Sequence, residues 1–295
     1  RQHGVAVSPR GLATVEVMAA HLTLTEPRRR FIDLPPGRVL NPAFAVAETL
    51  WILSGSDDPW IFRYNRGLAK YADDGRLQGA YGPRLRRWRD RIDQLDGVRQ
   101  LLRRDPDSRQ GVIQLFDPER DTKGHRDVPC TLAYRFYLRQ NRLHMHTTMR
   151  SQDVWLGLPY DVFTATVLQE LLAGWLEVAP GEYHHHIDSL HLYTEHLGRA
   201  ADLPEHPEPS VEMPPISVGW DDFRNLVAAA IAGEPPHGAG EAWVAFAHIM
   251  ASYRAWADGD VDTARTRAAA APGALGRALE RWYARLRPKT LADAS

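Results

Sequence analysis

The chain has 295 residues, of which 44% are hydrophobic and 25% charged, and its formal net charge is -1. These values predict a globular protein with a full core, in one large domain or about two. They exclude a global basic field for nucleic acid, so an anionic substrate would need a local arginine cluster. The lone Cys130 excludes an internal disulfide framework. Because no apolar segment has signal-peptide or membrane-spanning length, we expect a cytoplasmic protein.

The first part of the chain combines strand and helix patterns. Residues 12–26 are rich in β-branched residues and partly alternate, which predicts a strand. Apolar residues recur at helical spacing in 41–55, where Asn41-Pro42 is a suitable cap and first turn and Gly55 a suitable end.

Strand patterns dominate the middle of the chain and cover 111–116, 131–140, 142–151 and 182–196. The second and third of these join near Gln140-Asn141. Asp161 can cap an apolar helix over 162–178 that ends near Pro180-Gly181.

The last part of the chain is helical. Pro-rich residues 203–215 predict a linker, and helical patterns follow in 241–260 and 263–286. Strands in the middle with helices around them predict an α+β fold.

Cys130, just before a predicted strand, is the first candidate for chemistry. A lone cysteine is usually a small buried hydrophobe, whereas a nucleophilic thiol needs a nearby positive charge that lowers its pKa. Arg150, on the following strand, can supply that charge through a hairpin. Arg150 and Ser151 can also bind phosphate through N–H donors and a hydroxyl. Short loops add Arg109 and Arg10 to a possible phosphate site.

Four motifs then follow one another along the chain. They are Pro129-Cys130, Arg150-Ser151-Gln152-Asp153, Gly157-Leu158-Pro159-Tyr160-Asp161 and His191-Leu192-Tyr193-Thr194-Glu195-His196. Their order and spacing resemble the thymidylate synthase family, and upstream segments with Glu48, Trp51, Tyr81 and Arg109 extend the match to about residues 8–225. The resemblance implies a catalytic α+β sandwich of sheet and helices over 1–218 and a helical extension over 219–295.

The resemblance also implies a role for each matching residue. Cys130 would add to C6 of a pyrimidine, Glu48 would organise water and proton transfers, and Tyr81 would lie beside the base. The other site residues would bind the substrates: Arg10, Arg109, Arg150 and Ser151 the phosphate, His191 and Tyr193 the sugar, and Trp51, Asp153 and Gly157 the folate. Arg109 would reach across a homodimer interface. Without the resemblance, we would favour a helix-surface position for Glu48 and core packing for Trp51 and Tyr81.

Asp161 stands where thymidylate synthases have Asn. An Asn amide can donate to O4 and accept from N3–H of uracil, whereas a carboxyl group can accept from the cytosine amine while sharing a proton with N3. An ionised carboxylate would repel uracil O4. The residue therefore resembles that of cytidylate hydroxymethylases, which implies C5-hydroxymethylation of CMP, or next dCMP, with 5,10-methylenetetrahydrofolate and water. A plain helix N-cap is the alternative role for Asp161.

Several alternatives remain open at this point. The loop with Arg109 carries one arginine where the family usually has two, and Arg84 or Arg86 is a possible replacement. The run 184–188, HHHID, suggests zinc, but alternation along a strand leaves at most three of its residues on one side, so we expect no metal. The arginines of 28–30 and 84–91 could contact RNA, which we consider unlikely as the main partner. A thymidylate synthase that methylates dUMP is the closer rival.

Overall fold

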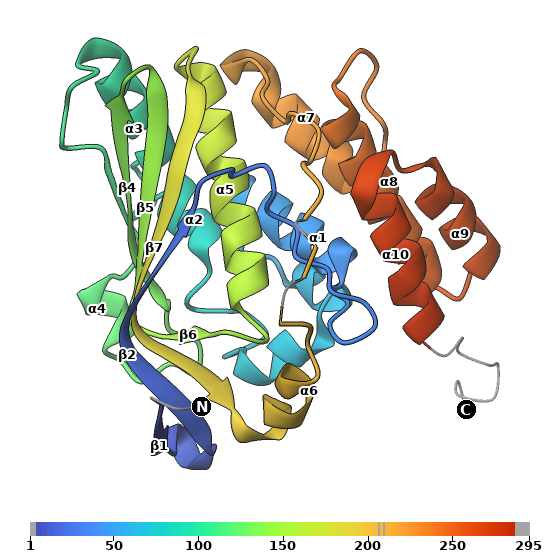
Figure 1. The fold of residues 1–295 in the computed structure, drawn as a ribbon. Coiled ribbons are helices and arrows are strands. Elements are labelled where there is room, and N and C mark those ends of the chain that lie inside the picture. The colour runs from blue at the N-terminus through green and yellow to red at the C-terminus, as the bar shows by residue number, and fades with distance from the viewer. Residues whose placement is uncertain (1–3, 206, 209, 287–295) are drawn as a thin grey trace.

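The strands form one mixed sheet in the computed structural model, which describes residues 4–205, 207–208 and 210–286 (Figure 1). The sheet has seven strands in the order β1-β2-β7-β5-β4-β3, with β6 paired to β7. The strands are β1 Val5–Val7, β2 Thr14–Leu24, β3 Val112–Gln114, β4 Thr131–Arg139, β5 Arg142–Met149, β6 Gln152–Asp153 and β7 Ala179–Tyr193.

Ten α-helices lie within the described residues. They are α1 Pro42–Leu53, α2 Tyr81–Arg86, α3 Gln94–Arg104, α4 Pro118–Asp121, α5 Leu158–Trp175, α6 Leu197–Ala201, α7 Trp220–Ala232, α8 Glu241–Ala257, α9 Val261–Ala270 and α10 Gly273–Arg285. Short 3-10 helices are η1 Pro9–Gly11, η2 Pro59–Arg63, η3 Arg66–Tyr71 and η4 Thr194–His196. The predicted α+β fold is confirmed.

The predicted hairpin joins β4 and β5, which pair antiparallel up to Arg139 opposite Arg142. Gln140 and Asn141 both have positive φ, 50° and 57°, as a two-residue turn matched to the strand twist requires. β5 and β7 are parallel, so the chain must cross over between them, and α5 makes that crossover. This topology places the start of β4 and the ends of β5 and β7 beside the start of α5.

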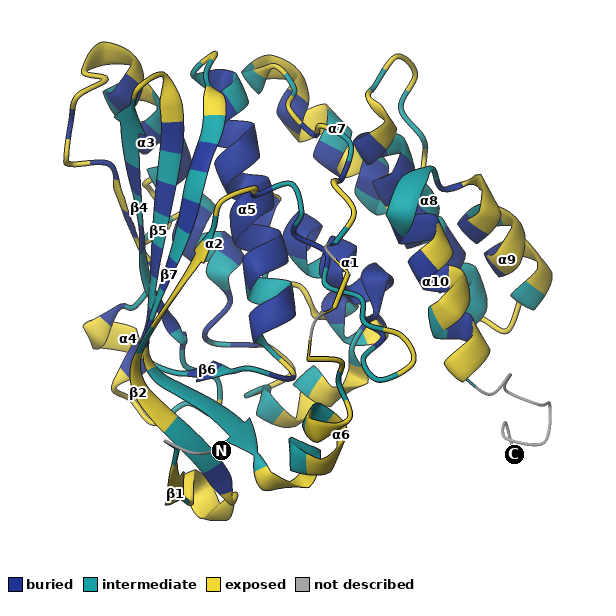
Figure 2. Ribbon diagram, in the orientation of Figure 1, coloured by how far each residue is buried: buried dark blue, intermediate teal, exposed yellow. Residues whose placement is uncertain are grey.

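Helix α5 packs against the sheet, and α1 packs against α5 on the side away from the sheet (Figures 1 and 2). Both are apolar on nearly all sides because the sheet and other helices enclose them. The Asn41 side chain accepts hydrogen bonds from the backbone N–H groups of Ala43 and Phe44, at 3.0 and 3.2 Å, which confirms the predicted cap. Gly55, with φ 79°, follows the end of α1 as predicted.

The boundaries of α5 differ from the prediction. The helix begins at Leu158 with Gly157 at the cap position, so Asp161 lies inside the first turn and is not the N-cap. It ends at Trp175, and residues 180 and 181 belong to β7. Proline is tolerated there because its missing N–H falls near the start of the strand.

The C-terminal helices form further layers beyond α1, with α9 outermost (Figure 1). Helices α7, α8 and α10 contact α1, and the indole N–H of Trp243 on α8 donates to the carbonyl of Ile216 at 3.0 Å. The described part of the linker 203–215 contains no helix or strand. Helices α7 to α10 lie within the predicted extension over 219–295, whose division from the rest of the chain stays a prediction, and the last nine residues of that range lie outside the described chain.

Candidate active site

Cys130 and Arg150 meet where the hairpin strands begin and end. Cys130 precedes β4, Arg150 follows β5, and the backbone N–H of Arg150 donates to the carbonyl of Cys130 at 2.9 Å. The Arg150 guanidinium donates to the carbonyls of Pro129 (2.9 Å) and Val128 (3.0 Å), so it is fixed against the loop that carries the thiol. The predicted proximity of these two residues is confirmed.

Arg150 lowers the pKa of the Cys130 thiol, as expected, but burial has the larger effect. Burial raises the pKa of Cys130 above its ordinary value and outweighs the opposing charge of Arg150. Asp161 and Asp127 raise the pKa further, whereas Arg10 lowers it. The free protein therefore holds a neutral thiol at pH 7, and the arginines reduce the cost of ionising it.

Three more predicted residues converge on this thiol. The backbone N–H of Thr131 donates to the hydroxyl oxygen of Tyr81 at 3.1 Å, and the charges of Asp161 and Cys130 act on Tyr81. Burial, and then the charge of Asp161, raises the pKa of Glu48 to about 8. The half-buried Glu48 thus points from α1 towards the start of α5, so its assignment to a helix surface is wrong.

Asp161 is a second carboxyl group whose pKa is displaced. Burial raises its pKa to about 6, and the nearby Asp153 adds to the rise. The Gln152 amide opposes the rise by donating to Asp161 Oδ2 at 2.8 Å. Two carboxyl groups with different raised pKa values in one site are a common arrangement for proton transfer. Gln152 had no predicted role, although it lies inside the Arg-Ser-x-Asp motif.

The phosphate candidates separate into two groups. Arg10 is exposed, and its charge acts on both Cys130 and Tyr193, so it belongs to the site. Ser151 follows Arg150 directly and is half-buried. Arg109 is exposed on the loop between α3 and β3, and within the described residues no hydrogen bond or ion pair joins it to Cys130 of its own chain.

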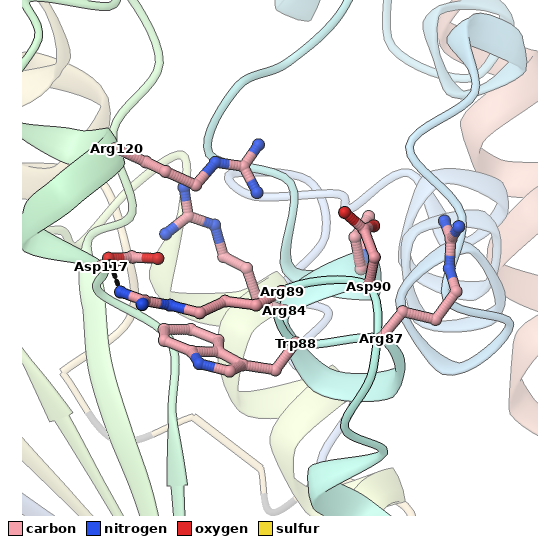
Figure 3. A pocket seen from close by; sticks show the side chains of 8 residues that line it. Arg84, Arg87, Trp88, Arg89, Asp90, Asp117 and Arg120 are labelled. Carbon is pink, nitrogen blue, oxygen red and sulfur yellow. Dashed lines mark hydrogen bonds and ion pairs between the residues drawn. The ribbon is translucent and has the colours of Figure 1, made fainter.

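Neither replacement considered for the second phosphate arginine fits. Arg84 is buried, and both of its terminal nitrogens donate to Asp121 at 2.6 Å. Arg86 pairs with Asp93 and lies over the rings of Trp220 and Phe223. Figure 3 shows Arg89 paired with Asp117 beside a pocket of only about 30 Å³. The basic run 84–91 thus serves mainly to hold the fold together.

The sugar and folate candidates lie on and beside β7. His191 pairs in register with Asp153, and its ring lies 5.4 Å from that of Tyr193. Asp153 Oδ1 accepts from the N–H groups of Trp155 (2.6 Å) and Leu156 (2.9 Å), whereas its buried Oδ2 has no hydrogen-bond partner among the described residues. A buried carboxylate oxygen of this kind suits an N–H donor on a ligand such as a pterin.

Trp51 packs in the core, and its place on the folate side stays a prediction. Its side chain is only 5% exposed, and its indole N–H donates to the carbonyl of Asp58 at 2.9 Å. Gly157 lies against Gln152 and Asp161, where a Cβ atom would approach the amide nitrogen to 2.8 Å. Its position therefore supports the geometry of Asp161 more directly than it offers a folate contact.

The histidines of 184–188 alternate across the sheet as predicted. His184 and His186 are half-exposed on the face away from α5, whereas His185 is buried beneath α5. Among the described residues, His144, Glu182 and His184 place possible ligand atoms within 4.8 Å of one another. This group lies on the sheet face opposite Cys130, so a metal held there would not reach the reacting atoms.

Comparisons with known proteins agree with this geometry. The thymidylate synthase family model matches residues 3–226. A deoxyuridylate hydroxymethyltransferase of Bacillus phage SP01 is 35% identical over 211 residues, which cover 67% of this chain and 55% of the phage protein. The chain thus spans about half the length of this curated relative. No described helix is long and apolar enough to cross a membrane. The chain belongs to the thymidylate synthase family.

Proposed function

We propose that the enzyme hydroxymethylates C5 of a cytidine 5′-monophosphate, using 5,10-methylenetetrahydrofolate and water. The observation that carries the proposal is the Asp161 carboxyl group, whose charge acts on Cys130, Tyr81 and Glu48 together. With a pKa of about 6, Asp161 can hold or share the single proton that pairing with the amine and N3 of cytosine requires. CMP is the favoured substrate and dCMP the next.

Each proposed step uses groups that lie together. Cys130 forms a bond from Sγ to C6, which makes C5 nucleophilic, and C5 then captures the methylene carbon. Loss of the C5 proton and of tetrahydrofolate leaves an exocyclic methylene on the nucleotide. Water adds to that carbon, and Cys130 leaves C6. Glu48, which is protonated below about pH 8, is placed to order this water and to relay protons.

The second substrate and the dimer belong to the same proposal. Arg10, Arg150 and Ser151 would bind the phosphate, His191 and Tyr193 the sugar, and Asp153 the folate. Arg109 is exposed and would reach the site of a second copy, with the half-exposed face of the sheet as the dimer interface. A cytoplasmic location suits these substrates.

A second candidate is hydroxymethylation of a uracil nucleotide. It is favoured by the name of the phage relative, which acts on deoxyuridylate. A protonated Asp161 could also donate to O4 of uracil and accept from N3–H, so the carboxyl group alone does not exclude it.

The arginines of 28–30, which could have contacted RNA, form ion pairs within the protein instead. Arg28, Arg29 and Arg30 pair with Glu212, Glu26 and Glu170 respectively. Their charges are therefore balanced within the protein, which leaves less positive potential for a phosphate backbone.

The test is mass spectrometry of separate reactions with CMP, dCMP, UMP and dUMP, each with methylenetetrahydrofolate. We expect a hydroxymethyl mass gain on CMP or dCMP, with tetrahydrofolate released. A hydroxymethyl gain only on UMP or dUMP would establish the second candidate. A methyl gain on dUMP with dihydrofolate formed would overturn both and identify a thymidylate synthase.

A further inference from the structure

A chain of buried hydrogen bonds runs from Asp161 into the sheet. Gln152 donates from Nε2 to Asp161 Oδ2 at 2.8 Å, and its Oε1 lies 3.1 Å from His185 Nε2. His185 Nδ1 lies 2.6 Å from the hydroxyl of Tyr183, which is also hydrogen-bonded to Thr147 at 3.0 Å. Gln152 is 3% exposed, and His185 and Tyr183 are each 1% exposed. Water therefore does not compete for these bonds.

Burial keeps both His185 and Tyr183 uncharged at pH 7. It lowers the pKa of His185 to about 4, so the ring is neutral at pH 7 and carries one N–H. Burial raises the pKa of Tyr183 well above its ordinary value, so the phenol keeps its proton. Gln152 Oε1 can only accept, so the ring N–H is on Nε2 and donates to it, and the phenol proton of Tyr183 is shared between Nδ1 at 2.6 Å and Thr147 Oγ1 at 3.0 Å. The amide of Gln152 must then present its N–H groups to Asp161.

This order matters because a carboxylic acid has two equivalent oxygens. A proton on one oxygen gives the donor and acceptor pattern that cytosine needs, and a proton on the other gives the pattern that uracil needs. Unlike an Asn amide, Asp161 does not choose between these patterns by its own chemistry. The donation from Gln152 makes Oδ2 an acceptor and leaves the proton to Oδ1, so only one pattern remains favourable.

We propose that Gln152, held in orientation by His185 and Tyr183, is the positioning residue that decides which base Asp161 recognises. The proposal rests on the proposed function only in taking Asp161 as the residue that contacts the base. It holds whether the preferred base is cytosine or uracil.

The backbone at Gly157 leaves room for the hydrogen bond between Gln152 and Asp161. Gly157 lies at the start of α5, where a Cβ atom would lie 2.8 Å from Gln152 Nε2 and 3.3 Å from Asp161 Oδ2. Any side chain at 157 would push the amide away from the carboxyl group. The glycine therefore leaves the space that the bond between Gln152 and Asp161 occupies.

The main test replaces Gln152 with Met, which keeps the length of the side chain and removes the amide. The measurements are kcat and KM for CMP, dCMP, UMP and dUMP, and Kd for each nucleotide without folate. A paired contact to a base edge discriminates by roughly 5- to 150-fold. We expect the cytosine-to-uracil ratio of kcat/KM to move at least about tenfold towards 1. The change should appear in KM and Kd, with kcat on the preferred base less affected.

The matched control is Gln169→Met on α5. Gln169 is also a buried amide, and it donates to the carbonyls of Leu143 (2.9 Å) and Gly181 (3.1 Å) rather than to Asp161. Its replacement should lower the melting temperature without changing the base ratio. An unchanged ratio in Gln152→Met, or an equal change in both variants, would overturn the proposal.

A second pair of variants changes His185, the hydrogen-bond partner of Gln152. It tests the proposal even if Gln152→Met does not fold. His185→Phe removes the N–H that orders Gln152, and His185→Gln replaces it with an amide N–H. We expect the base ratio to move towards 1 in the first variant and to recover in the second. Equal ratios in the two variants would overturn the proposal. A wild-type preference for uracil would overturn the proposed cytosine substrate, but the ratio should still collapse towards 1.

Discussion

Replacing Glu48 with Gln should stabilise the fold increasingly as the pH rises, while turnover is lost. Burial and the charge of Asp161 raise the pKa of Glu48 from 4.5 to about 8. Between these two pH values the folded protein holds a proton that the unfolded chain has released, so the stability of the wild type falls as the pH rises. Above about pH 8 the folded protein carries the full cost of a buried carboxylate. Gln has no such cost at any pH.

The size of the effect follows from the displaced pKa. A displacement from 4.5 to about 8 corresponds to about 5 kcal/mol if it is realised fully. Because the Glu48 side chain is only half-buried, we expect about 2–3 kcal/mol. For a chain of this size that is about 4–6 °C in melting temperature.

The assay is thermal unfolding of both proteins at pH 5 and pH 8.5. The melting temperature of Glu48→Gln minus that of the wild type should be larger at pH 8.5. The control is Glu26→Gln, which makes the same change at an exposed carboxylate and should show no such trend. If the difference between Glu48→Gln and the wild type is the same at both pH values, Glu48 titrates normally and the argument for its role in proton transfer fails.

Three further predictions concern the thiol, the fold and the dimer. Arg150→Gln should move the midpoint pH of Cys130 alkylation upwards, because it removes a positive charge that lowers a thiol pKa already raised by burial; an unchanged midpoint would contradict this. Arg84→Leu should lower the free energy of unfolding, measured with denaturant, by about 3–5 kcal/mol, because it leaves Asp121 buried and without its ion-pair partner. A loss below about 1 kcal/mol would contradict this and mean that Asp121 becomes protonated or solvated easily. Mixing Arg109→Ala with Cys130→Ser subunits should restore turnover above that of either parent if Arg109 serves the partner's site, whereas no gain would place Arg109 outside it.

Local patterns in the sequence determined much of the secondary structure. The cap at Asn41, the turn at Gln140-Asn141 and the hairpin that joins Cys130 to Arg150 depend on groups close together in the chain or on paired strands. Such features follow from backbone geometry and short-range hydrogen bonding. The ordered motifs also identified the family, because their spacing survives without knowledge of the packing.

The tertiary structure decided the pKa values in the site and the partners of the arginines. Arg84 bonds to Asp121, and Gln152 bonds to His185, across 37 and 33 residues respectively, distances over which no periodic pattern predicts a partner. Burial raised the pKa of Cys130 against the effect of Arg150, and it gave Glu48 and Asp161 different pKa values. Desolvation depends on everything that surrounds a group after folding. A sequence can therefore identify residues that carry chemistry, but only the packed fold sets their protonation and their partners.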